Sequence, residues 1–194
     1  MNKIGIFGGS FNPIHMGHLL IAQSALENCD LRKVFFIPVY TPPHKENKVL
    51  PAEDRVEMIK MAIEDNPAFD LELLEIRRKG ISYTIDTVRE LDSRYKGLNK
   101  LILIIGTDSL LEFTTWKDYT ILLEMCEIAV VPRLDFKTDR IPSELHNKYK
   151  LLNMPEFNIS STQIRNRILS GKDIKYMVPD KVREYIINKK LYSI

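Results

Sequence analysis

Short, continuous apolar runs recur along this 194-residue chain and constrain its fold more than any other feature. Each run is rich in β-branched residues and lacks the alternation of a strand with one face in water. We therefore expect strands that are covered on both faces. Segments with helical spacing lie between the runs, and this alternation predicts a parallel sheet with helices on both sides. The predicted strands are Ile4–Phe7, Val34–Ile37, Phe69–Leu74, Leu101–Ile105 and Ile128–Val131.

The predicted fold is thus α/β, a doubly wound Rossmann-like sheet of five or six parallel strands. Helices are expected after His18, over Asp54–Ala62 and over Tyr83–Tyr95. The C-terminal part, from about residue 160 to 194, is expected to be helical, with a glycine ending its first helix and a proline opening its last. No break in composition divides the chain, so residues 1–194 are expected to form a single domain.

Charge and hydropathy narrow the classes of function. With 28 basic and 26 acidic residues the chain carries a net charge of +2, without the clustered basic excess of a duplex-binding protein. We expect no nucleic-acid partner. No run approaches the roughly 20 apolar residues of a membrane span, and the N-terminal run is too short for a signal peptide. We expect a cytoplasmic protein with no membrane partner, its two cysteines buried as thiols. The sequence is also compatible with a homo-oligomer.

A glycine pair, Gly8 and Gly9, directly follows the first predicted strand. Ligands of parallel sheets bind at carboxyl strand ends, and glycines let an anion approach main-chain amides. A helix beginning between His15 and Gly17 would add free amides and a positive dipole end. His15 and His18 share one face of its first turn, and Gly17 removes a side chain where a phosphate would approach. Two histidines at this spacing also occur in metal pairs or on surfaces, but the ordered combination indicates an anion site.

A second cluster lies far along the chain, at Ile159–Arg165. Ser160 or Ser161 is a natural N-cap, and the helix that follows again offers amides to an anion. Arg165 falls about one turn into that helix, so its guanidinium can reach back over the helix start as a fork of donors suited to phosphate. A capped helix with a surface arginine is common, so this segment alone is a weak signal.

Together these segments resemble a known family. Gly8–His18 resembles the His-x-Gly-His region of the nucleotidyltransferase superfamily, which includes class I aminoacyl-tRNA synthetases, and within it the bacterial nicotinate-mononucleotide adenylyltransferases. Ile159–Arg165 resembles the Ile-Ser-Ser-Thr-x-Ile-Arg signature of the same family. That family joins nicotinate mononucleotide to ATP and releases pyrophosphate. The resemblance implies catalytic roles for His15, His18 and Arg165. It implies ATP contacts for Gly8, Gly9, Ser10, Phe11, Gly17, Ile159, Ser160, Ser161 and Thr162.

Other matches to the family concern the acceptor mononucleotide. On residue chemistry alone, Lys45 is a solvated lysine, Asp108 is as much a helix cap as a ribose ligand, and Trp116 is as typical of a core as of a stacking surface. The resemblance implies that Lys45 and Arg133 lie near phosphate and that the Tyr83-Thr84 backbone meets the pyridine carboxylate. The acceptor contacts it implies are Lys45, Tyr83, Thr84, Gly106, Asp108, Trp116 and Arg133.

The implied reaction is an in-line attack of the acceptor phosphate on the α-phosphorus of ATP, which needs positioning and charge neutralisation more than a strong base. Mg²⁺ is expected to arrive with ATP, because the sequence contains no carboxylate cluster for a protein-built metal site. The alternatives are an adenylyltransferase for nicotinamide mononucleotide or another phosphate acceptor such as phosphopantetheine, and a nucleotide-binding module without turnover. A synthetase is disfavoured because the chain has no room for a tRNA-binding domain.

Overall fold

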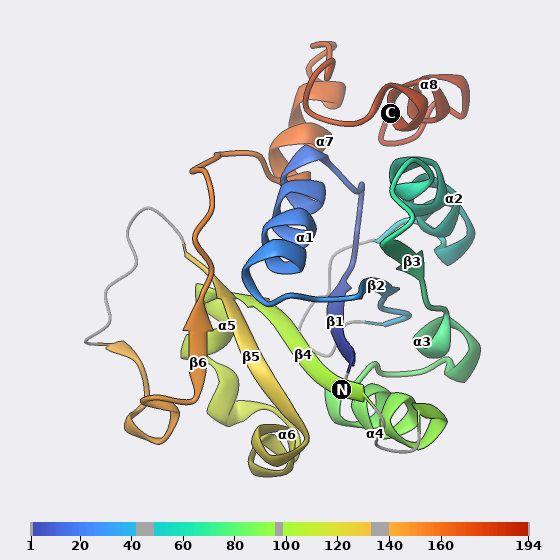
Figure 1. Cartoon of the computed structure of the whole chain (residues 1–194). Coiled ribbons are helices and arrows are strands. Elements are labelled where there is room, and N and C mark those ends of the chain that lie inside the picture. The colour runs from blue at the N-terminus through green and yellow to red at the C-terminus, as the bar shows by residue number, and fades with distance from the viewer. Residues whose placement is uncertain (1, 42–48, 96–98, 133–139, 194) are drawn as a thin grey trace.

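The computed structural model describes residues 2–41, 49–95, 99–132 and 140–193. Its centre is a six-stranded parallel sheet in the order β3-β2-β1-β4-β5-β6 (Figure 1). The order reverses at β1, the strand that carries the glycine pair, so the sheet is doubly wound as predicted. The strands are β1 (Asn2–Gly9), β2 (Lys33–Pro38), β3 (Phe69–Leu71), β4 (Asn99–Gly106), β5 (Cys126–Val131) and β6 (Tyr149–Leu151).

Each central strand is buried on both faces, which explains its unbroken apolar sequence. In β4, Ile102 and Ile104 belong to one core, while Leu101, Leu103 and Ile105 belong to the other. Gly5 in β1 allows tight packing, because a Cβ there would lie 2.8 Å from Leu31 Cδ1. The sheet thus separates two apolar cores.

Helices cover both faces (Figure 1). The first core receives α1 (Met16–Asn28), α2 (Ala52–Ile63), α7 (Ser161–Leu169) and α8 (Asp180–Asn188). The second receives α3 (Leu74–Arg78), α4 (Thr84–Tyr95), α5 (Thr107–Leu111), the 3₁₀ turn Phe113–Thr115 and α6 (Tyr119–Met125). The C-terminal helices α7 and α8 therefore share a core with α1 and α2, and α8 packs against α2.

The third predicted strand, Phe69–Leu74, is too long. β3 ends at Leu71, and Leu74 begins α3 instead. The apolar run continues through this point because Leu74 is buried in the second core as a helical residue. Glu72 interrupts the apolar run and accepts a hydrogen bond from Arg77 at 2.6 Å. A short apolar run does not by itself distinguish a strand from a buried helical turn.

Several short elements have no periodic signal in the sequence. The edge strand β6 has three residues, and α3 and α5 have five each. A helix of five residues contains fewer than two turns, and a strand of three residues contains little more than one alternation. A period of 3.6 or 2 residues cannot be recognised in so short a segment. No helix among the described residues is long and apolar enough to cross a membrane, and the thiols of Cys29 and Cys126 are both buried and free.

Candidate active site

The glycines predicted to bind ligand lie at one edge of the sheet. Gly8 and Gly9 end β1, and Gly106 ends the neighbouring strand β4. A Cβ at Gly8 or Gly106 would meet no heavy atom within 4 Å, so the space beside both backbones is open. The two segments that follow these neighbouring strands therefore begin at the carboxyl edge, where parallel sheets bind ligands.

The two predicted histidines form one compact unit at the start of α1. His15 is the N-cap residue, and its amide donates to Nδ1 of His18 at 3.1 Å. The imidazole rings stack with centroids 3.7 Å apart. Because His18 Nδ1 accepts a hydrogen bond, the neutral ring carries its proton on Nε2. His18 thus presents an N–H donor on the side away from the backbone.

Burial keeps both imidazoles neutral. Desolvation lowers the pKa of His15 from 6.5 to about 4. Desolvation, and then the charge of His15, lower the pKa of His18 well below its usual value. Nδ1 of His15 is buried and has no hydrogen-bond partner among the described residues. A bound anion would favour the charged form of either ring, so the pair is a polar surface whose charge depends on its ligand.

The start of α1 is less open to an anion than the sequence predicts. The amide of Met16 donates to the carbonyl of Met177 at 2.9 Å, and that of His18 donates to the carbonyl of His15. The expectation of a set of free amides is therefore wrong for these two groups. The segment before α8 bonds the first amide, and the first turn of α1 itself bonds the second. The other first-turn amide belongs to Gly17, which is itself buried.

The structure gives Gly17 a packing role. A Cβ on this residue would lie 2.4 Å from Cε2 of Phe157 and 3.0 Å from Nδ1 of His15. The expected reason for this glycine, the approach of a phosphate, is thus incomplete. The ring of Phe157, in the segment that leads to α7, already occupies the space that a side chain would need.

The second predicted segment meets the first directly. Arg165 in α7 donates from Nη1 to the carbonyl of Asn12 at 2.8 Å and from Nη2 to Oγ1 of Thr162 at 3.0 Å. Oγ of Ser161 donates to the carbonyl of Pro13 at 2.8 Å. Ser160 is the N-cap of α7 and accepts from the amide of Gln163. The guanidinium does reach back over the helix start, and it holds the β1–α1 loop as it does so.

Two other predicted ATP contacts are partly committed to packing. Phe11 is buried, with its ring edge-on to Phe7 and to His18 at centroid distances of 5.6 and 5.0 Å. Any contact of Phe11 with ATP is therefore left to its backbone, which has a left-handed φ of 45°. Ile159 is partly buried against the first core.

The acceptor-side predictions lie around the start of α4 and the segment after β4. Lys117, the residue after Trp116, places its Nζ 4.6 Å from the centre of the Tyr83 ring. Trp116 is partly buried, 5.1 Å from the Phe113 ring centre. Thr84 begins α4, so its amide belongs to a first helical turn. Asp108 is exposed in the first turn of α5, whose N-cap is Gly106 and not the aspartate.

Lys45 and Arg133 lie outside the described residues. The described start of the segment that leads to Lys45 is tied to the acceptor side. Thr41 forms a β-bridge with Ile81, and the amide of Tyr40 donates to Oγ of Ser82 at 3.0 Å. The chain before Lys45 is thereby anchored beside Tyr83.

Sequence patterns do not identify three residues that support the β1–α1 loop. Arg55 in α2 is 1% exposed, and its guanidinium donates to the carbonyls of Ser10 and Leu50. Oη of Tyr192 donates to Oδ1 of the buried Asn12 at 2.8 Å. A charged residue at an otherwise apolar helix position was the available signal for Arg55. Asn12 lies within the predicted segment Gly8–His18 but was given no role there, and Tyr192 carries no pattern.

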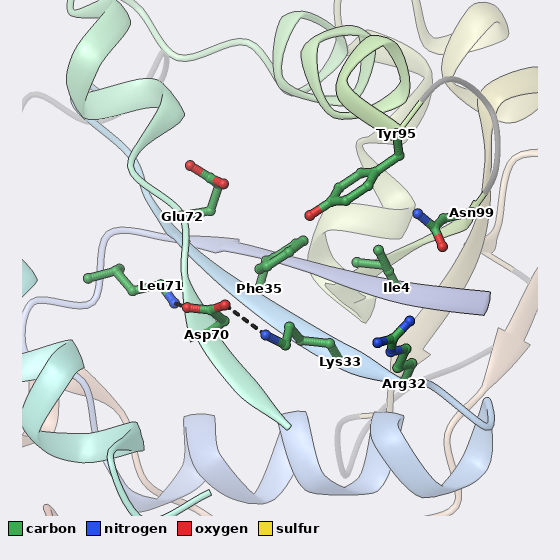
Figure 2. Close-up of a pocket in the computed structure, with 9 residues that line it drawn as sticks. All are labelled: Ile4, Arg32, Lys33, Phe35, Asp70, Leu71, Glu72, Tyr95 and Asn99. Atoms are coloured by element: carbon green, nitrogen blue, oxygen red, sulfur yellow. Dashed lines mark hydrogen bonds and ion pairs between the residues drawn. The ribbon is translucent and has the colours of Figure 1, made fainter. Parts of the chain in front are cut away.

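A separate cavity of about 300 Å³ lies near the amino-terminal ends of β1, β2 and β4 (Figure 2). Ile4, Phe35 and Tyr95 line it together with charged residues, among which Lys33 and Asp70 form an ion pair at 2.9 Å. None of the predicted site residues lines this cavity, which is at the opposite end of the parallel strands from Gly9 and Gly106.

Comparison with known proteins identifies the family to which this site belongs. Residues 6–167 match the cytidylyltransferase-like family. The chain is 43% identical to the nicotinate-nucleotide adenylyltransferase of Bacillus subtilis, with 100% of each chain covered. It is 40% identical to a probable nicotinate-nucleotide adenylyltransferase of Dictyoglomus thermophilum, covering 98% of this chain and 99% of the other. The chain belongs to the nicotinate-nucleotide adenylyltransferase family.

Solved structures agree on the fold of this adenylyltransferase. The nicotinic acid mononucleotide adenylyltransferase of Plasmodium falciparum, in a complex with NaAD, aligns with a TM-score of 0.80 at 22% identity, covering 99% of this chain and 98% of that one. A putative nicotinate-nucleotide adenylyltransferase of Vibrio parahaemolyticus aligns with a TM-score of 0.74 at 22% identity, covering 99% of this chain and 96% of that one.

Gly17→Ala in this adenylyltransferase is expected to lower the free energy of unfolding by about 1–3 kcal/mol, because the methyl group overlaps Phe157. Without that overlap, alanine in a helix would be favoured by up to about 1 kcal/mol. Urea unfolding of Gly17→Ala, Phe157→Ala and the double variant measures the coupling. Strictly additive effects would show that Phe157 does not set the space at Gly17.

The histidine pair should make stability depend on pH. The pKa of His15 is about 4 in the folded chain and 6.5 for an ordinary histidine, as in the unfolded chain. The unfolded chain therefore binds a proton more tightly, and protonation favours unfolding. The contribution of His15 is full above pH 6.5 and is lost as the pH falls toward 4, by about 3 kcal/mol in total. Urea unfolding at pH 7 and 4.5 should therefore show a smaller loss for His15→Asn than for wild type. The variant His146→Asn, at an exposed site, should lose as much unfolding free energy as wild type between pH 7 and 4.5. Equal losses in wild type and both variants would show that His15 is not the source of the pH dependence.

Proposed function

We propose that this chain transfers the adenylyl group of ATP to nicotinate mononucleotide between the β1–α1 loop and the start of α7. The products are nicotinate adenine dinucleotide and pyrophosphate. The reaction is a step in the synthesis of NAD. The observation that carries the proposal is the bond from Arg165 to the Asn12 carbonyl. It joins the two signature segments beside the histidine pair, in a chain 43% identical to a nicotinate-nucleotide adenylyltransferase over its full length.

The triphosphate is assigned to the side of the proposed site formed by the starts of α1 and α7. The Nε2–H of His18 and the Gly17 amide supply donors from α1, and His15 lies in stacking contact with His18. Arg165 and the first turn of α7, at Ser160–Thr162, are assigned to the departing β- and γ-phosphates. Gly8, Gly9, Ser10 and Ile159 are assigned to the remaining ATP contacts.

The acceptor is assigned to the side formed by the starts of α4 and α5. The amides at Tyr83 and Thr84 suit the pyridine carboxylate, because a first helical turn presents donors to an anion. Trp116 offers an aromatic plane for the pyridine ring, and Asp108 offers a carboxylate for ribose hydroxyls. Gly106, Lys45 and Arg133 complete the proposed acceptor set.

The proposed reaction is one displacement at phosphorus. An oxygen of the acceptor 5′-phosphate forms a bond to the α-phosphorus of ATP, the bond to the β-phosphate oxygen breaks, and pyrophosphate leaves with the electron pair. The attacking phosphate is already ionised at neutral pH, so the site needs no general base. Catalysis then depends on positioning and on donors aimed at the charge that develops on the phosphoryl oxygens.

Mg²⁺ is proposed to enter with ATP. Among the described residues no group of three or more His, Cys, Asp or Glu side chains forms a metal site, which fits an ion held mainly by phosphate oxygens and water. When bound, Mg²⁺ neutralises phosphate charge. The two buried thiols and the ATP substrate support a cytoplasmic location, and the net charge of +2 supports a function without nucleic acid.

The acceptor can be tested by pyrophosphate release from ATP and Mg²⁺ with nicotinate mononucleotide, nicotinamide mononucleotide and phosphopantetheine. We expect kcat/KM to be highest for nicotinate mononucleotide, by at least about tenfold, because a helix-start amide pair binds a carboxylate better than a neutral amide. A preference for the nicotinamide form would change the assigned acceptor. No release with any acceptor would reject the proposed reaction.

His18→Asn is expected to lower kcat by about a hundredfold or more, as the loss of one preorganised donor to a phosphoryl-transfer transition state does. Asparagine can still accept from the His15 amide, so the start of α1 should remain folded. Turnover is compared with the midpoint of thermal unfolding, which should change little. A folded variant with near-normal kcat would remove His18 from the mechanism.

A further inference from the structure

The chain folds back sharply after its last helix. Just beyond α8, Lys190 has a left-handed φ of 50°. The amide of Lys190 donates to the carbonyl of Ile187, and the amide of Leu191 donates to the carbonyl of Ile186. This pattern is a common helix end. Tyr192 follows with a second left-handed φ, of 63°. A bulky residue rarely adopts this conformation, which persists where surrounding contacts impose it and which is concentrated at functional sites.

The contacts of Tyr192 lie at the β1–α1 loop, 180 positions earlier in the sequence. Its hydroxyl donates to Oδ1 of Asn12 at 2.8 Å. Asn12 is 5% exposed, and the same Oδ1 accepts from the amide of Leu50 at 3.4 Å. The end of the chain is therefore bonded to the segment that separates the glycine pair from His15.

Two arginines hold the same loop from other directions. Arg55 donates to the carbonyl of Ser10 at 3.0 Å, and Arg165 donates to the carbonyl of Asn12 at 2.8 Å. Burial raises the pKa of the Tyr192 hydroxyl, and the charges of Arg165 and then Arg55 lower it by a smaller amount. The hydroxyl stays protonated at neutral pH and acts as a donor.

The loop needs this support because its own backbone is strained. Phe11 has a φ of 45°, and the buried rings of Phe7 and His18 fix its side chain. Asn12 lies between two predicted site residues, Ser10 and His15. A displacement of Asn12 would therefore move both of them.

We infer that Tyr192 is a positioning residue for ATP, which fixes the β1–α1 loop through Asn12 so that the His15–His18 pair and Arg165 face the triphosphate together. The inference rests on the proposed function for the assignment of this loop to ATP. It places a determinant of ATP affinity at the end of the chain, outside both signature segments.

The test compares Tyr192→Phe with the matched variant Tyr185→Phe in the full-length chain. Tyr185 also loses one bond, from its hydroxyl to Oδ1 of Asp54 at 2.8 Å, but that bond goes to α2 and not to the β1–α1 loop. The measurements are the Kd of ATP with Mg²⁺ by calorimetry, KM for each substrate, kcat, and the midpoint of thermal unfolding. Binding of ATP is measured without acceptor, so it remains informative if dinucleotide synthesis is not observed.

We expect Tyr192→Phe to raise the Kd and KM of ATP by about three- to tenfold, the effect of one neutral hydrogen bond. The KM of nicotinate mononucleotide should change less than twofold, and Tyr185→Phe should leave the ATP values unchanged. The inference is overturned if Tyr192→Phe binds ATP within twofold of wild type, if both KM values rise equally, or if Tyr185→Phe has the same effect. A wild type that binds ATP but makes no dinucleotide rejects the proposed function alone, and one that binds no ATP rejects both.

Discussion

The bond from the Arg165 guanidinium to the Asn12 carbonyl is the contact on which the candidate site depends. Its partners are 153 positions apart, and the last strand of the sheet, β6, ends at Leu151, before α7 begins. Strand pairing therefore does not place α7 beside β1. The buried Ile164 in the first core does so, together with the hydrogen bonds from Arg165 to the Asn12 carbonyl and from Ser161 to the Pro13 carbonyl. Bonds from a charged donor are roughly twice as strong as neutral ones, which suits a contact that must align two segments.

The same contacts divide the electrostatic roles in the site. Burial lowers the pKa values of His15 and His18, so the pair is neutral before an anion binds. The permanent positive charge comes from guanidinium groups, one in α7 and one beneath the loop at Arg55. Arg55 is buried, and burial lowers its pKa. Its guanidinium donates to the carbonyls of Leu50 and Ser10, and these two dipoles stabilise the positive charge. A neutral histidine surface flanked by fixed cations can receive a triphosphate without first burying two additional charges.

The sequence predicts the parts of this structure that depend on local periodicity. The central strands are continuous apolar runs because both faces are covered, and Ser160 caps α7 because its side chain reaches the Gln163 amide. Phe69–Leu74 was predicted too long because Leu74 is apolar for a helical reason. Gly17 was linked to phosphate alone because the approach of Phe157, 140 positions away, leaves no pattern in the sequence. Arg55 and Tyr192 act through tertiary hydrogen bonds, which no spacing encodes.

These features change the physical description of anion binding at this helix start. Free amides and a helix dipole were sufficient reasons to predict a phosphate site, but the Met16 amide is already bonded to Met177. The donors in the proposed site, the Gly17 amide, the Nε2–H of His18 and Arg165, come from two helices. If the proposed triphosphate site is correct, affinity depends on the relative placement of α1 and α7 more than on either helix alone. The residues that hold the loop between them, Arg55 and Tyr192, would then contribute to binding from beneath the surface of the site.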